Sequence, residues 1–271
     1  MKTNGQFLSP TRQAELLPAE TSKRPVVGYS KDYPAGLIAD AHSHPKAQLI
    51  YAVSGVMHVE TTHVSYSIPP STALLMPAGV VHSIHMEGQV AMRTLFLRAA
   101  AAKGRCEQCK VITVTPLLRE LILTACCESV DRVTNSRNHH LVMLALDEID
   151  RSSVLPLNLP LTPDPRLRTI IDALRANPAN SSPLSQWASV TNVSERTLAR
   201  LFRHKTGLSF RQWRQNARLT AAMSALAVGK SLAIAAEIAG FDSQPAFGAA
   251  FRRFFGVTPG QARTISTKQR P

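Results

Sequence analysis

The sequence is poor in acidic residues and in cysteine, and it has no long apolar run. Its 271 residues include 18 Asp and Glu against 31 Lys and Arg, a formal net charge of +13. No apolar stretch approaches the roughly 18 residues that a membrane-spanning helix needs, and no charged-then-apolar leader opens the chain. We therefore expect a soluble, cytoplasmic protein without a membrane partner.

The few cysteines do not form a recognisable metal motif. They are one C-x-x-C pair, Cys106 and Cys109, and one adjacent pair, Cys126 and Cys127. A structural zinc site would need further ligands at regular spacing, which this sequence does not offer. We expect reduced thiols, and the sequence assigns them no role.

The excess of positive charge is concentrated in the C-terminal part of the chain. Residues 166–271 carry a formal charge of +12, whereas residues 1–164 carry +1. Clustered Lys and Arg gain free energy by releasing counterions from a phosphate backbone. The charge therefore indicates a polyanionic partner for the C-terminal part. There are two alternatives: the charge only increases solubility, or it attracts the domain to an anionic membrane surface.

The first part of the chain has the pattern of many short strands. Residues 1–25 lack apolar periodicity and are expected to form a poorly ordered arm. From Val26 to Leu97, short apolar runs alternate with Pro and Gly, which predicts a small β-barrel or sandwich. The predicted strands are Gln48–Ser54, Val56–Thr62, Val64–Ile68, Ala73–Met76, Val81–Met86 and Met92–Leu97, with turns at 54–55, 69–70 and 77–79.

The pattern becomes helical after Thr115. Helices are predicted over 116–127 and 137–151, and they extend the β-domain to residues 26–151. Residues 152–163 are rich in Leu and Pro and predict an extended linker. Only helical patterns follow over 164–265, before a tail at 266–271. The expected fold class is α+β with two domains, a small β-barrel with two helices and then an all-α domain.

A helix, a tight turn and a second helix are predicted over residues 184–207. Ser194 caps the second helix and Gly207 ends it. Arginines on the free face of such a second helix are typical of a helix-turn-helix, which places that helix in the major groove. Arg196 and Arg200 can each contact a guanine, and contact with phosphate alone is the alternative. The DNA-binding candidates here are Ser194, Arg196, Thr197, Ala199, Arg200 and Arg203.

The same layout recurs over residues 231–256. Ser243 caps a second helix that is expected to bury Phe247, Phe251 and Phe254, and Gly256 ends it. A continuous helix over 210–228 joins the two units and spans roughly 28 Å, which suits two contacts about one DNA turn, ~34 Å, apart. The candidates in this unit are Ser243, Gln244, Pro245, Gly248, Ala249, Arg252 and Arg253.

Residues 164–263 resemble the AraC/XylS family of transcription regulators. The resemblance is carried by Ser194–Gly207, Trp213–Leu219, Ala239–Ser243 and Phe251–Pro259. A duplicated helix-turn-helix with its joining helix is a specific match. It implies double-stranded DNA as partner, with base contacts from Arg196, Ala199 and Arg200, and from Gln244, Pro245, Gly248 and Ala249.

The second unit departs from the usual family pattern at Gly248 and Ala249, where larger polar side chains are often found. A glycine inside a helix also costs about 1 kcal/mol relative to Ala. We therefore expect the first unit to supply most of the sequence discrimination. The second unit is expected to bind phosphates through Ser243, Gln244, Arg252 and Arg253.

The N-terminal domain is similar to the cupin-type sensing domain of many family members. The matching residues are His42, His44 and Gln48, followed by His82, and the resemblance implies that these four lie where cupins bind metal. Three imidazoles can hold Zn²⁺, Ni²⁺ or Fe²⁺. Gln48 stands where metal-binding cupins have Glu. There are two alternatives to a metal site: the histidines line a pocket for an organic ligand, or they only form hydrogen bonds inside the barrel.

The predicted function is a sequence-specific transcription regulator, activator or repressor, whose barrel senses a small molecule or a metal ion. A metal-dependent cupin enzyme is one alternative, but no acid, base or nucleophile pairing is evident, so we expect no catalysis. A ligand-independent architectural DNA binder is another. The transcription machinery is a further expected partner. The resemblance also implies a homodimer through residues 116–151, whose apolar faces would equally well cover the barrel.

Overall fold

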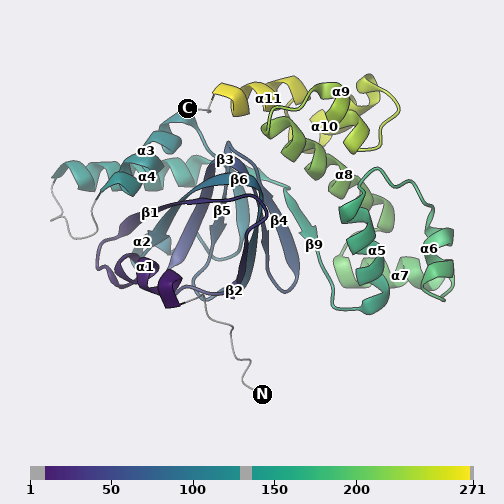
Figure 1. Ribbon diagram of the computed structural model, residues 1–271, viewed down its shortest axis with the longest axis horizontal. Coiled ribbons are helices and arrows are strands. Elements are labelled where there is room, and N and C mark those ends of the chain that lie inside the picture. The colour runs from purple at the N-terminus through teal and green to yellow at the C-terminus, as the bar shows by residue number, and fades with distance from the viewer. Residues whose placement is uncertain (1–9, 129–135, 269–271) are drawn as a thin grey trace, which may run out of the picture. The chain divides into compact units, whose positions relative to one another are not determined.

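The chain forms two compact units (Figure 1). A computed structural model describes residues 10–128 and 136–268, with side chains over 14–128 and 137–263. The first unit contains the described residues up to 61 and residues 68–156, and the second contains 62–67 and 157–267. The predicted α+β class, an antiparallel β-domain followed by a helical domain, is confirmed.

An antiparallel sheet forms most of the first unit. Its strands follow the order β1-β6-β3-β5-β7-β8, and β2 pairs with the start of β6 while β1 pairs with its end. The long strand β6 thus carries β1 and β2 along its length. The elements are β1 (Val26–Tyr33), β2 (Ile38–His42), β3 (Ala47–Glu60), β5 (Thr72–Met76), β6 (His82–Leu97), α2 (Ala99–Ala102), β7 (Lys110–Thr113) and β8 (Val154–Leu155).

β3 and β6 are longer than predicted, because each joins two of the predicted runs. The predicted turn at Ser54 and Gly55 is wrong. Gly55 has φ +79° and lies within β3, where the register with β6 shifts. A Cβ on Gly55 would lie 2.3 Å from the carbonyl oxygen of Gln89, so the close approach of two strands, and not a chain reversal, requires glycine. The predicted turns at 69–70 and 77–79 do separate strands.

Two helices follow the sheet, α3 (Pro116–Cys127) and α4 (Ser136–Arg151), as predicted within one residue. α3 lies against β1. A Cβ on Gly28 would be 2.3 Å from the carbonyl oxygen of Ala125, so only glycine permits this approach. Leu144, which the helical pattern placed on the buried side of α4, is 40% exposed.

The predicted disorder of the 1–25 arm is wrong for its central part, which forms helix α1 (Pro10–Thr21). Leu16 and Ala19 are buried against Val27 and Phe96 of the sheet. Two apolar side chains are too few to produce a recognisable helical period, so packing against the sheet determines this helix. Residues 1–9 lie outside the described residues.

The second unit is mainly helical. Its first helix, α5, begins at Pro165 with Asp164 as cap, and it buries the predicted side chains of Leu167, Ile170 and Leu174. The elements are β4 (Val64–Ile68), β9 (Asn158–Pro160), α5 (Pro165–Ala176), α6 (Leu184–Val190), α7 (Glu195–Thr206), α8 (Phe210–Ala227), α9 (Leu232–Ile238), α10 (Gln244–Phe255) and α11 (Pro259–Lys268). α11 extends past the predicted end of the domain at 265 and into the predicted tail.

The predicted linker, residues 152–163, is extended but not free. Its first strand, β8, pairs with β7, and its second, β9, pairs with β4. Leu157 between them is fully buried, and the indole N–H of Trp213 donates to the carbonyl oxygen of Pro160 at 2.8 Å. Burial of Leu157 therefore holds this segment in place. The prolines of the segment only exclude a helix.

Residues 64–67 of strand β4 are grouped with the second unit, although they lie early in the sequence. β4 pairs antiparallel with β9, and the backbone N–H of Leu161 donates to the carbonyl oxygen of His63 at 2.6 Å. The hydroxyls of Ser67 and Ser224 share a buried hydrogen bond of 2.8 Å. The second unit is therefore built from two separate stretches of chain.

Candidate DNA interface and histidine cluster

The first helix-turn-helix consists of α6, a tight turn and α7. Asn192 in the turn has φ +53°, a left-handed conformation that Asn adopts more readily than most residues. Ser194 caps α7 by accepting a hydrogen bond from the backbone N–H of Thr197 at 3.2 Å. Gly207 ends the helix with φ +73°. Local side-chain chemistry therefore sets both ends of this helix.

One face of α7 is exposed to solvent. Leu198 and Phe202 are fully buried, so the opposite side of the helix faces solvent. Arg196 and Arg200 are exposed there, one turn apart, as two guanidinium groups that reach neighbouring base edges must be. Of the predicted residues, Ser194, Arg196, Ala199, Arg200 and Arg203 are exposed and Thr197 is half-buried.

In the second helix-turn-helix, formed by α9 and α10, α10 begins after a serine cap and ends at a left-handed glycine, as α7 does. Ser243 caps α10, accepting from the backbone N–H of Ala246 at 3.4 Å, and Gly256 ends it with φ +75°. The exposed candidates are Ser243, Gln244, Pro245, Ala249, Arg252 and Arg253, and Gly248 is half-buried. A Cβ on Gly248 would meet none of the described atoms within 4 Å, so packing does not require glycine there.

The buried side of α10 differs from the prediction in one residue. Phe247, Phe251 and Phe255 are buried, at an i, i+4, i+8 spacing that follows one helix face, whereas Phe254 is half-buried. The ring of Phe254 packs edge-on against Phe255, with 4.8 Å between centroids. The predicted i+7 position therefore lies at the rim of the aromatic core.

α8 connects the two helix-turn-helix units. It has 18 residues and spans roughly 27 Å at 1.5 Å per residue, close to the length of the predicted helix. Arg214 donates to the carbonyl oxygen of Ser182 at 2.9 Å, and Arg218 donates to those of Pro178 and Ala179 at 3.0 and 3.1 Å. These two arginines bind the loop between α5 and α6, so they stabilise the domain instead of adding to a DNA-binding face. Net charge alone does not reveal this.

Three histidines of the first unit lie together. His42 ends β2, His82 begins β6, and the two are direct partners in the strand register. His44 follows two residues after His42, and the ring centroids of the three side chains are 4.4 to 5.6 Å apart. One candidate ligand atom from each ring lies within 4.8 Å of the others. Gln48 of β3 is buried and lines the same pocket.

Hydrogen bonds fix the orientation of these three rings. The Nδ1 atom of His42 lies 2.6 Å from the carbonyl oxygen of Asp40, and that of His82 lies 3.0 Å from the carbonyl oxygen of Val80. A carbonyl oxygen can only accept, so each Nδ1 carries the proton and each Nε2 holds the lone pair. The Nε2 atom of His82 is buried and has no hydrogen-bond partner among the described residues. Nε2 is therefore the candidate ligand atom.

Burial keeps the rings of His44 and His82 neutral. Desolvation, followed by the nearby His42, lowers the pKa of His44 to about 3. Desolvation also lowers the pKa of His82 to about 3, and the hydrogen bond to Val80 opposes this shift. Neutral imidazole is the form that binds a metal ion.

The side chain of Glu20 completes the cluster, and sequence reasoning missed it. Its Oε1 lies 2.5 Å from Nδ1 of His44, so His44 also directs Nδ1 away from the other two rings. Burial raises the pKa of Glu20, while His42 and Lys46 act to lower it. Glu20 lies on α1, in the segment predicted to be disordered, and no local pattern links it to a histidine 24 positions later.

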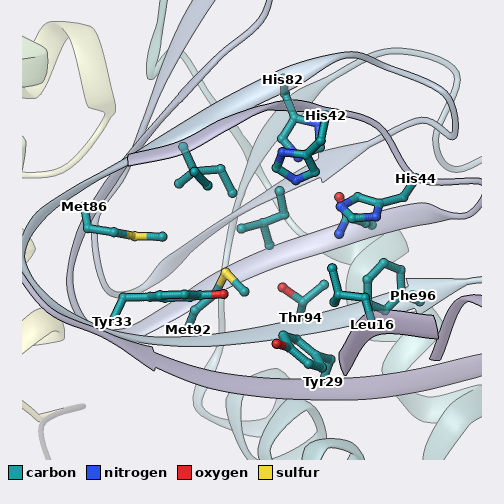
Figure 2. A pocket seen from close by; sticks show the side chains of 14 residues that line it. Leu16, Tyr29, Tyr33, His42, His44, His82, Met86, Met92, Thr94 and Phe96 are labelled. Carbon is teal, nitrogen blue, oxygen red and sulfur yellow. The ribbon is translucent and has the colours of Figure 1, made fainter. Parts of the chain in front are cut away.

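The cluster forms one end of a small pocket. In Figure 2 the three histidines lie together, and Tyr33, Met86 and Met92 lie at the opposite end. The pocket has a free volume of about 30 Å³. A cavity needs roughly 10–15 Å³ of such space to hold one water molecule, so this pocket has room for a very small occupant.

The cysteines form no disulfide, and burial shifts the pKa of two of their thiols. Burial raises the pKa values of Cys106 and Cys126 to about 12. The thiol of Cys126 on α3 donates weakly to the carbonyl oxygen of Tyr29 at 3.5 Å. These two thiols are therefore poorly reactive.

Comparison with known proteins matches both parts of the chain. Residues 25–148 match the model of an AraC-like ligand binding domain, and residues 187–265 match a helix-turn-helix domain. The chain is 33% identical over 225 residues to the HTH-type transcriptional regulator NimR of Escherichia coli K12, covering 83% of this chain and 82% of NimR. It is 39% identical over 106 residues to the regulator RipA of Corynebacterium glutamicum, covering 39% of this chain and 32% of RipA.

Two solved structures illustrate the similarity of the chain to known folds. ToxT from Vibrio cholerae is 10% identical, with a TM-score of 0.38, over 89% of this chain and 99% of that chain. A regulator from Chromobacterium violaceum with an AraC-type DNA-binding domain is 28% identical, with a TM-score of 0.36, over 38% of this chain and 94% of that chain.

A ligand-binding β-domain followed by a double helix-turn-helix defines a class of protein, the DNA-binding transcription regulators with a ligand-binding domain of their own. Within that class, the chain belongs to the AraC family. It is a regulator and not an enzyme, as the sequence predicted. No described helix is long and apolar enough to cross a membrane.

Proposed function

We propose that the β-domain of this regulator senses a divalent transition-metal ion, held by the Nε2 atoms of His42, His44 and His82. This proposal rests mainly on one observation: each of the three rings is hydrogen-bonded through Nδ1 to an acceptor that is not one of the three histidines. Histidine ligands of metals are typically oriented in this way by their second nitrogen. Bound there, Zn²⁺, Ni²⁺ or Fe²⁺ would supply positive charge to a buried pocket.

The volume of the pocket favours an ion over an organic effector. Sites for organic ligands are usually about 300–1,000 Å³, whereas the free volume here is about 30 Å³. The buried Nε2 of His82, without a partner among the described residues, is an unsatisfied polar atom of the kind that needs an explanation. A metal ion with its remaining water ligands satisfies both observations.

Titration with Co²⁺, followed by its absorption spectrum, tests the metal proposal. Wild-type protein is expected to bind one ion per chain, and both His82→Asn and His42→Ala are expected to lose that binding. His58→Ala is the matched control, because His58 pairs with Glu87 at 2.8 Å outside the cluster. Equal binding by all four proteins, or none by the wild type, would contradict the proposal, and circular dichroism would confirm folding.

We also propose that α7 reads the base sequence while α10 mainly binds phosphates. Arg196 and Arg200 supply exposed bidentate donors on α7. On α10, Gly248 offers no side chain, and the exposed arginines, Arg252 and Arg253, stand near the end of the helix. Phosphate contacts position a protein on DNA without distinguishing sequences.

Regulation requires that the two activities be coupled. An effector changes DNA affinity only if it binds one DNA-binding state more tightly than the other. We expect the affinity for operator DNA to differ between the Co²⁺-loaded and the chelator-treated protein, and this difference to vanish in His82→Asn. Gel-shift titrations of both forms would measure it, and identical affinities would contradict metal sensing even if the ion binds.

A further inference from the structure

Helix α1 brings a carboxylate to the histidine cluster. Glu20 lies in its last turn, and its Oε1 is 2.5 Å from Nδ1 of His44. The His44 side chain is 4% exposed and that of Glu20 is 20% exposed. The pair is therefore largely shielded from water, where an ionic hydrogen bond is stronger than on an open surface.

The pocket has no negative charge of its own. None of the described residues that line it is acidic, and the carboxylate that metal-binding cupins carry is replaced here by Gln48. Three neutral imidazoles and an amide would hold a divalent ion with its whole charge uncompensated. Isolated buried charge is costly, and a nearby opposite charge reduces that cost.

The sheet domain holds α1, and with it Glu20, in place. Nζ of Lys46, a buried side chain, donates to the carbonyl oxygens of Ala19 and Ser22, both at 2.7 Å. A cation at the C-terminal end of a helix also interacts favourably with the helix dipole. Together with the packing of Leu16, this places Glu20 beside His44.

We infer that Glu20 is the anionic positioning residue of the metal site. Its carboxylate holds His44 with the proton on Nδ1 and the lone pair on Nε2, and it supplies the negative charge that Gln48 lacks. The inference rests on the proposed metal sensing and extends the site to a residue from α1. Because linkage is reciprocal, metal binding and the docking of α1 then stabilise each other.

Substitution of Glu20 by Gln tests the inference, since Gln retains a hydrogen-bond acceptor and removes the charge. Loss of such an outer partner typically weakens metal binding 10- to 100-fold, and we expect a loss of about this size in Co²⁺ affinity. Glu15→Gln is the matched control on the same helix, because Glu15 pairs with Lys31 at 2.8 Å on the surface. The control is expected to bind Co²⁺ as the wild type does.

Two further measurements separate charge from structure. The double variant Glu20→Gln, Gln48→Glu returns a carboxylate to the pocket and is expected to regain Co²⁺ affinity. Hydrogen exchange of the backbone amides of residues 15–21 is expected to slow when Co²⁺ binds to the wild type, and not in Glu20→Gln. A residue that only stabilised the fold would give neither result.

The outcomes distinguish the inference from the proposal beneath it. If the wild type does not bind Co²⁺, both are overturned. If binding depends on His82 but Glu20→Gln binds as tightly as the wild type, only the role of Glu20 is overturned. If Glu15→Gln and Glu20→Gln weaken binding equally, Glu20 acts through the helix alone, and the inference again fails.

Discussion

The two units present their functional groups in opposite ways. The first buries its chemistry: His42, His44 and His82 are each at most 9% exposed. The second unit exposes it, with Arg196 and Arg200 at the surface of α7. A buried site changes the stability of its own domain when it is titrated or occupied. An exposed cationic face changes affinity for a polyanion and leaves stability almost unaffected.

The largest expected difference between the units is their response to acid. His82 has a pKa of 6.5 when unperturbed and about 3 in the folded state, so below pH 6.5 the unfolded chain binds a proton that the folded chain does not. Stability must then fall as pH decreases, by about 1.4 kcal/mol per pH unit for each such ring. Urea unfolding of chelator-treated protein between pH 6.5 and 5 measures this slope.

Spectroscopy can assign that slope to one unit. Both tryptophans, Trp187 and Trp213, lie in the second unit, so their fluorescence reports that unit alone. We expect the circular dichroism transition of the sheet to shift with pH more than the fluorescence transition does. His82→Asn should reduce the slope and His58→Gln should not. An equal shift of both transitions would contradict the comparison.

A smaller effect is expected from removing one arginine of α7. Arg200→Ala should lower the affinity for operator DNA by about 1–3 kcal/mol and relax base preference at one position. Arg252→Ala, the matched change on α10, should weaken binding to all sequences alike and reduce the salt dependence. Gel shifts with operator and mutated operator measure both. Sequence preference that survives Arg196→Ala and Arg200→Ala, but not Gln244→Ala, would reverse the assignment of the two helices.

The smallest effect concerns glycine in the second unit. Gly248→Ala should raise the free energy of unfolding by about 1 kcal/mol, because the helix interior disfavours glycine and a Cβ there meets open space. Gly207→Ala should lower it by about 1–2 kcal/mol, since Gly207 is left-handed with φ +73°. Urea unfolding followed by tryptophan fluorescence measures both, and changes of the same sign would contradict these two expectations.

Features set by local chemistry could be predicted from the sequence. The caps at Asp164, Ser194 and Ser243 are as expected, because each depends on a side chain and a backbone amide at most three residues away. The alignment of His42 with His82 could be anticipated only through the family resemblance, since register between distant strands has no local signal.

Features set by tertiary packing could not be predicted. Helix α1 depends on the sheet that covers Leu16 and Ala19, and Glu20 reaches His44 only through that docking. The sequence predicted a turn at Gly55 because glycine is common both in turns and where two strands approach each other closely. In α10 the difference between Phe254 and Phe255 is one residue, about 100° around a helix, which a short apolar pattern does not resolve.

The contacts of β4 bear on how such regulators can be divided and recombined. A fragment that began at Leu157 would keep every helix of the DNA-binding unit but lose the strand that pairs with β9. It would expose an unpaired strand edge, a common starting point for aggregation, and leave the hydroxyl of Ser224 without Ser67. Exchange of sensing domains between relatives at the linker would therefore need to transfer residues 62–67 together with the DNA-binding part, as a strand matched to its new neighbours.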